Sequence, residues 1–188
     1  MKKRNKIMEW ITVKKALIAT AFFAIMTYII DFSPIGTLGL MKAVPGVELL
    51  DFYAWYSTQE CYAVLEKLGE LGRDFCLYKI MPIDIFFPLS VMMFEVTWMS
   101  VMLKYLSGPK NPLRLLPILG VFGMLCDWGE NIGITLMLKN YPQQLETVCA
   151  ITGTISGIKL LCIPGVFLIL AILLIACVIK KVLSLGKQ

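Results

Sequence analysis

Four long apolar stretches constrain this chain more than any other feature of its sequence. They cover about residues 12–32, 80–103, 113–138 and 155–179. A helix needs about 20 predominantly apolar residues to cross the hydrocarbon core of a bilayer, and each stretch reaches that length. The sequence therefore predicts an all-α fold, a four-helix transmembrane bundle that forms a single polytopic membrane domain over residues 1–188.

Composition and charge placement indicate how such a bundle would lie in a membrane. Of the 188 residues, 58% are hydrophobic and 16% are charged, whereas a soluble domain carries about 25% charged residues. Basic side chains gather before the first span, between the second and third, and after the fourth. The positive-inside rule therefore predicts a multi-pass protein of the cell (plasma or inner) membrane with both termini in the cytoplasm. The net charge of +5 indicates this topology and an attraction to anionic membrane lipids, and we expect no nucleic-acid partner.

The connection between the first and second spans, about residues 47–79, is predicted to lie on the outer side. Ser57 and Glu60 have the spacing of a helix capping box. After them, apolar residues recur at steps of three and four, which predicts an amphipathic helix. This helix either lies on the outer membrane face or covers the outer end of the bundle. We favour the second arrangement, with Glu70 and Arg73 as candidate residues of that cap, because helices on a membrane surface usually carry more lysine and arginine.

Cysteine and histidine usage narrows the chemistry that the chain can perform. Cys61, Cys76 and Cys149 fall on the predicted outer side, where an oxidising compartment would allow Cys61 and Cys76 to form a disulfide. No outer pair has the close Cys-x-x-Cys spacing of membrane disulfide-forming enzymes. The chain has no histidine, which removes histidine-ligated haem, histidine-bound zinc and catalytic pairs that contain histidine. We therefore expect no cofactor and no metal.

The third span carries polar side chains near its centre. Asp127, Glu130 and Asn131 project from one side of the predicted helix because they lie three and four residues apart. An aspartate at the centre of a spanning helix costs ~2.5–3.5 kcal/mol on insertion scales, so these groups need partners inside the protein. They form either a functional cluster, which we favour, or interhelical hydrogen bonds that only hold the bundle together.

Ionisable residues in the neighbouring spans are the expected partners. Asp84 and Glu95 lie on one face of the second span, and Glu95 is near its centre. Lys159 lies about one turn inside the outer end of the fourth span, at a depth similar to that of Asp84. For Asp84 and Lys159, the alternative is that the side chain reaches out to the lipid headgroups. Turned inwards, these groups would form a shared polar pocket that opens to the outer side.

An ordered pattern of residues runs from about position 50 to position 142. It consists of Tyr56 and Tyr62, Leu65, the run from Leu68 to Arg73, Tyr78, Asp84, Phe87-Pro88, Leu116-Pro117, Asp127, Glu130-Asn131 and Tyr141-Pro142. This pattern resembles that of a widespread group of small bacterial four-span integral membrane proteins. The resemblance implies a four-span fold in a bacterial inner membrane and implies no particular reaction. Cys76 departs from the pattern, so no thiol chemistry is carried over.

Together, these features favour an integral membrane protein whose intramembrane acidic pocket binds or moves a small amphiphile or cation. Glu95, Asp127 and Glu130 would supply charge or a proton, Asn131 a hydrogen bond, and Lys159 a counter-charge. One alternative is a lipid-modifying enzyme that uses paired carboxyls as acid and base. The other is a non-catalytic or immunity-type protein, with a second copy of the chain or another membrane protein as its partner.

Overall fold

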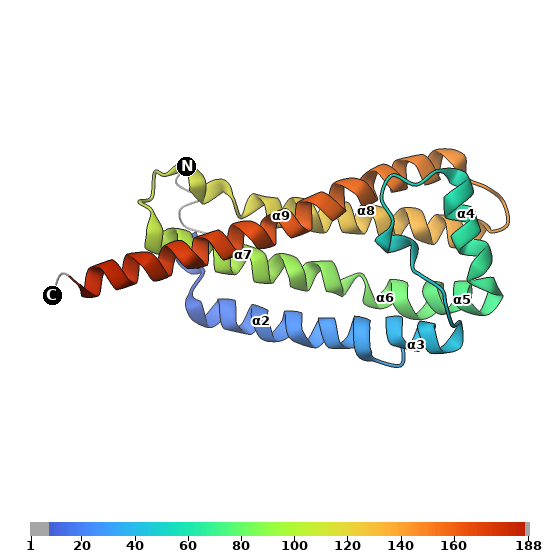
Figure 1. Ribbon diagram of the computed structural model, residues 1–188, viewed down its shortest axis with the longest axis horizontal. Helices are drawn as coiled ribbons and strands as arrows, with labels where there is room; N and C mark the ends of the chain where they lie inside the picture. The colour runs from blue at the N-terminus through green and yellow to red at the C-terminus, as the bar shows by residue number, and fades with distance from the viewer. Residues whose placement is uncertain (1–7, 187–188) are drawn as a thin grey trace.

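The computed structural model describes residues 8–186, and every regular element within them is helical (Figure 1). Four helical segments are long and apolar enough to cross a membrane, namely Val13–Ala43, Gly69–Leu106, Pro112–Asn140 and Glu146–Leu185. Their long helices lie side by side, and α2 begins at the same end of the molecule at which α9 ends (Figure 1). The predicted all-α, four-helix bundle is therefore confirmed.

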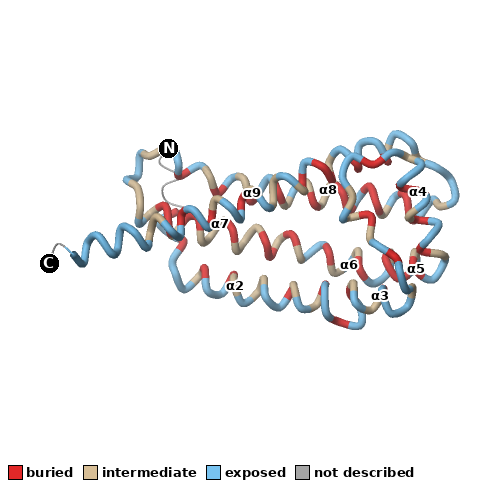
Figure 2. The backbone as a smooth tube through the Cα atoms, in the orientation of Figure 1, coloured by how far each residue is buried: buried red, intermediate tan, exposed pale blue. Residues whose placement is uncertain are grey.

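Each spanning segment contains one long regular helix. These helices are α2 (Val13–Thr27), α7 (Phe86–Leu106), α8 (Ile118–Asn140) and α9 (Glu146–Leu185). A π-helical turn, Tyr28–Phe32, follows α2, and a 3-10 turn, Pro112–Leu115, precedes α8. The longest helix, α9, begins before the predicted apolar stretch and continues past it, so that its last turns are exposed beyond the bundle (Figure 2).

The buried side chains form two apolar clusters, one towards each end of the bundle. The cluster at the end where α9 terminates contains Met99, Leu103 and Val166 from α7 and α9. The cluster at the opposite end contains Leu40, Leu65 and other residues of the short helices that close that end (Figure 2). Many large apolar side chains are exposed on the outside of the bundle, as expected of side chains that face lipid.

Short helices and an irregular segment, residues 44–57, form the closed end of the bundle, and we call this segment the strap. The short helices are α3 (Thr37–Ala43), the 3-10 turn Leu50–Phe52, α4 (Thr58–Lys67) and α5 (Gly69–Phe75). The predicted capping box is confirmed at the start of α4, where the Ser57 hydroxyl accepts from the Glu60 N–H and Glu60 accepts from the Ser57 N–H. The structure has two helices where the sequence predicted one, because Gly69 has a φ of +62°, a left-handed conformation that breaks the helix.

Side chains of α4 and α5 connect these short helices to the loop between α8 and α9. The Arg73 guanidinium donates to the Leu65 carbonyl oxygen at 3.0 Å and lies 3.8 Å from the centre of the Tyr141 ring. The Tyr62 hydroxyl donates to the Gln143 carbonyl oxygen at 2.9 Å. Glu70 is exposed, and in the described part of the chain its side chain forms no hydrogen bond or ion pair.

The six cysteines are free thiols. Cys61 and Cys76 are buried in the apolar cluster of the closed end, where a thiol packs as a small apolar side chain. Cys61 Sγ lies 3.5 Å from Met137 Sδ. The pairing of Cys61 with Cys76 that the sequence allowed is therefore wrong for this structure.

Candidate functional site

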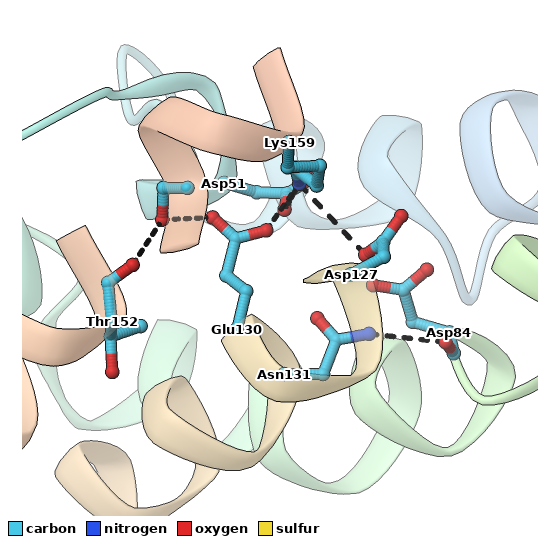
Figure 3. A network of polar contacts seen from close by, with 8 residues as sticks. Asp51, Asp84, Asp127, Glu130, Asn131, Thr152 and Lys159 are labelled. Atoms are coloured by element: carbon cyan, nitrogen blue, oxygen red, sulfur yellow. Dashed lines mark hydrogen bonds and ion pairs between the residues drawn. The ribbon is translucent and has the colours of Figure 1, made fainter. Parts of the chain in front are cut away.

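Lys159, in α9, is the centre of a buried polar cluster (Figure 3). Its ammonium group forms ion pairs with Asp51 and Glu130 and lies 3.9 Å from Asp127 Oδ1. The side chains of Lys159 and Glu130 are only 6% and 0% exposed. Lys159 therefore points into the bundle, and the structure brings it together with both acids predicted from the third span.

Three separate elements position this cluster. Asp127 and Glu130 come from α8, Lys159 from α9, and Asp51 from the strap that crosses the closed end. The Ser156 hydroxyl, one turn before Lys159, forms a hydrogen bond with the Glu130 carboxyl and lies 2.9 Å from the Thr152 carbonyl oxygen. A segment from outside the spanning helices thus contributes Asp51 to the cluster (Figure 3).

The strap is fixed to α9 by backbone contacts as well. The Trp55 N–H donates to the Gly153 carbonyl oxygen at 3.0 Å. At Gly157, one turn further, an added Cβ would lie 2.2 Å from the Trp55 ring, so only glycine allows this approach. Two glycines of α9 therefore hold the strap, and with it Asp51, against the bundle.

The cluster carries more acid than base. Asp51, Asp127 and Glu130 lie around one lysine, and Asp84 lies next to Asp127 (Figure 3). No other lysine or arginine of residues 8–186 forms an ion pair with these four acids. The Asp51 side chain is 31% exposed; its partial burial opposes ionisation, but the Lys159 ammonium outweighs this and holds the pKa of Asp51 below its usual value. Buried charges without partners are costly, so the cluster requires further positive charge, as protons or as a cationic ligand.

Three of these carboxyl groups have the spacing of metal ligands. Oxygen atoms of Asp51, Asp127 and Glu130 lie within 4.8 Å of one another, and hard cations such as Mg²⁺ prefer carboxylate oxygens. The Lys159 ammonium lies among the same oxygens, however, and forms ion pairs with two of the three residues. An ammonium group therefore already supplies the charge that a metal ion would bring to this place.

Asn131 forms a hydrogen bond between two of the spanning segments. The second spanning segment is interrupted between α6 (Met81–Ile83) and α7, next to Pro88. In a continuous helix, the Asp84 carbonyl oxygen would accept from the N–H of residue 88, which proline lacks. The Asn131 amide instead donates to that oxygen at 3.1 Å, and the Trp128 indole N–H donates to the Ile85 carbonyl oxygen at 3.0 Å. Side chains of α8 thus satisfy the backbone of the broken helix.

Glu95 does not join the cluster. It is buried in α7 against Gly120 of α8, where an added Cβ would lie 2.9 Å from Glu95 Oε2. Gly120 precedes Asp127 by two helical turns, roughly 10 Å along the axis. In the described part of the chain, Glu95 Oε1 has no hydrogen-bond partner. The expectation that Glu95 shares one pocket with Asp127 and Glu130 is therefore wrong, because Glu95 is held two turns further from the closed end.

A cavity of about 280 Å³ lies beside the cluster, inside the closed end of the bundle. Leu50 and Asp51 of the strap form one wall, and Asp84 lies in another. Apart from Asp31, Asp51 and Asp84, its lining is almost entirely apolar. An apolar chamber with carboxyl groups in its wall suits a ligand that has a hydrocarbon part and a positively charged part.

Sequence reasoning missed Asp51, Ser156 and Thr152. Asp51 was counted among the acids of the outer connection, although it stands in the apolar run Leu49-Leu50-Asp51-Phe52. An acid within such a run was the available signal that it is buried. Ser156 and Thr152 carried no comparable signal, because hydroxyl groups are common in spanning helices.

No family model, curated protein or solved structure matches this chain.

Proposed function

We propose that this integral membrane protein binds a small amphiphile with a cationic head group, and that the cavity beside Lys159 is its binding site. The observation that carries the proposal is the combination of an apolar chamber with an acidic cluster that lacks enough positive charge. The volume of about 280 Å³ is near the lower end of the ~300–1,000 Å³ of small-molecule pockets, which favours a small ligand.

Asp84 is the residue that would contact the head group. Its side chain lines the cavity, and the residue is 6% exposed. Among the described residues, its carboxylate has no ion pair, whereas Asp51 and Glu130 both pair with Lys159. An ammonium group of the ligand beside Asp84 would supply the positive charge that the cluster needs.

We place this site in the outer half of the membrane, with both termini in the cytoplasm of a bacterial cell. The support is the basic character of the termini and of the connection between the second and third spans. The cavity lies at the end of the bundle opposite to the C-terminal end of α9 (Figure 1). A ligand would thus come from the outer leaflet or from the outer solution.

The test is a thermal-stability assay of the purified protein in lipid nanodiscs. A ligand at 100 times its Kd adds ~2.7 kcal/mol, which is a rise in Tm of about 5–10 °C for a chain of this size. We expect this rise with octylamine and none with 1-octanol, which matches it in length and carries no charge.

A matched pair of variants separates binding from folding. Asp84→Asn relieves repulsion among the buried acids, so we expect it to keep or raise the Tm and to lose the octylamine effect. Asp74→Asn, at an exposed position of α5, should keep both properties. An equal rise with octanol, or an Asp84→Asn variant that still responds to octylamine, would refute the proposal.

A further inference from the structure

A second hollow lies between residues 77–85 and α8, on the side of the broken helix that faces away from the cavity. It measures about 650 Å³ and is mostly apolar. We call it the lateral groove, and its lining includes Tyr78, Met81, Ile85, Trp128, Asn131 and Ile132. Tyr78, Ile85 and Ile132 are largely exposed on the outside of the bundle, so the groove opens towards lipid.

The broken helix separates the lateral groove from the cavity. Ile80, Asp84 and Phe87 line the cavity at helical steps of four and three residues, whereas Tyr78, Pro82 and Ile85 line the groove at the same steps. Met81 contributes to both linings. The two hollows are therefore on opposite faces of one segment, with a single side chain common to both.

This dividing wall also contains the break in the second spanning segment, between α6 and α7. The helix is interrupted at Asp84 and Ile85. The Asn131 amide of α8 donates to the Asp84 carbonyl oxygen, and the Trp128 indole N–H of α8 donates to the Ile85 carbonyl oxygen. Few backbone bonds have to break for this segment to move, because Pro82 and Pro88 donate none. The wall is thus the natural place for a passage between groove and cavity.

Asn131 supplies a separate indication that the groove receives a polar group. It is only 8% exposed, and its Oδ1 has no hydrogen-bond partner in the described part of the chain. A buried amide oxygen without a partner costs ~1–3 kcal/mol. An N–H donor of a ligand that extends from the groove towards Asp84 would satisfy this oxygen.

We propose that the lateral groove holds the hydrocarbon tail of the amphiphile whose cationic head binds in the cavity, and that the ligand enters from the bilayer through the α6–α7 break. The inference rests on the proposed function and names its ligand class, a single-chain amine dissolved in the membrane. A chain too long for about 280 Å³ has to leave the cavity, and the groove offers about 650 Å³ of apolar space directly behind the wall.

The test compares a short and a long amine on a variant with a filled groove. Radiolabelled butylamine and dodecylamine are titrated onto the protein in lipid nanodiscs, and binding to empty nanodiscs is subtracted. In Ile132→Trp, a bulky side chain fills the groove from a position that is exposed in the native protein, so the core is not overpacked. We expect a loss of affinity of at least tenfold for dodecylamine and less than twofold for butylamine.

Leu125→Trp is the matched control, because Leu125 is also exposed on α8, seven residues earlier on the same side of the helix, and does not line the groove. It should bind both amines as the native protein does. If Ile132→Trp fails to fold, Leu136→Phe fills the same groove and carries the same expectation.

The outcomes separate the two proposals. If the native protein binds neither amine, the proposed function itself is refuted, and this inference with it. If the native protein binds both amines and a folded groove-filling variant retains dodecylamine, or loses both amines equally, then the groove is not the tail site and the inference is overturned.

Discussion

Replacement of Lys159 by methionine is the sharpest perturbation of the buried cluster. Methionine keeps most of the side-chain volume and removes the ammonium that pairs with Asp51 and Glu130. Removing one partner of a buried ion pair costs ~3–5 kcal/mol, because the other partner keeps an uncompensated charge. We expect a cost in this range, since Lys159 is 6% and Glu130 0% exposed and water barely screens the pair.

The expected cost corresponds to a large change in Tm. At ~2–4 °C per kcal/mol for a chain of this size, Lys159→Met should lower the Tm by about 6–20 °C. Differential scanning fluorimetry in one detergent, with circular dichroism to verify the helical content, measures this change. The double variant Lys159→Met/Glu130→Gln should recover part of the loss, because it removes one of the charges left unpaired.

Lys181→Met is the control, because Lys181 lies on the same helix and is exposed beyond the bundle. Its effect should stay within ~0.5 kcal/mol, as for most surface substitutions. A Tm for Lys159→Met within 2 °C of the native value would contradict the buried ion pairs of Lys159. It would mean that the ammonium lies in the headgroup region and that the acids have other partners.

Three further predictions follow from the local contacts. Asn131→Leu leaves the Asp84 carbonyl oxygen without a donor and should lower the free energy of thermal unfolding by ~1–3 kcal/mol. Pro88→Ala supplies a backbone N–H, so the double variant Asn131→Leu/Pro88→Ala should lose less stability than Asn131→Leu alone. Hydrogen bonds from Ser57 hold the pKa of the Glu60 carboxyl below its usual value, so the unfolded chain binds the carboxyl proton more tightly than the folded protein does. The contribution of Glu60 to the free energy of unfolding is therefore complete above the ordinary glutamate pKa of ~4.3, and it is lost as the pH falls through the lower folded-state pKa. A titration from pH 6 to pH 3 should therefore reduce the stability difference between the native protein and Glu60→Gln, and a constant difference would contradict this. Gly157→Ala should displace the strap and lower the Tm, whereas Gly165→Ala on the same helix, with nothing within 4 Å of its Cβ, should be neutral or stabilising by up to ~1 kcal/mol.

The helices were predictable because their signals are local. Apolar stretches of about 20 residues identify spanning helices, and the Ser57–Glu60 spacing located the start of α4. The bounds were less predictable, since α9 begins at Glu146 in a segment whose polar residues gave no spanning signal. The break at Gly69, where φ is +62°, was also missed, because a glycine within an amphipathic pattern occurs in continuous helices as well as at their ends.

The site was predictable only in part, because side chains meet across helices whose rotation the sequence does not specify. The i, i+3 spacing placed Asp127 and Glu130 together, and the cost of an isolated amine in the membrane indicated Lys159 as their partner. Glu95 also lies near the centre of its predicted span, where an acid needs a partner inside the protein, yet it packs against Gly120 elsewhere in the bundle. Asp51 comes from a strap whose path is determined by its contacts with Gly153 and Gly157, which no local pattern reveals.

The most direct test of the proposed binding site is native mass spectrometry of the protein released from its own membrane. We expect a single bound molecule that contains a basic nitrogen and a hydrocarbon chain, present on the native protein and absent from Asp84→Asn. A native protein that carries no basic molecule, or an Asp84→Asn variant that carries the same molecule in the same amount, would contradict it.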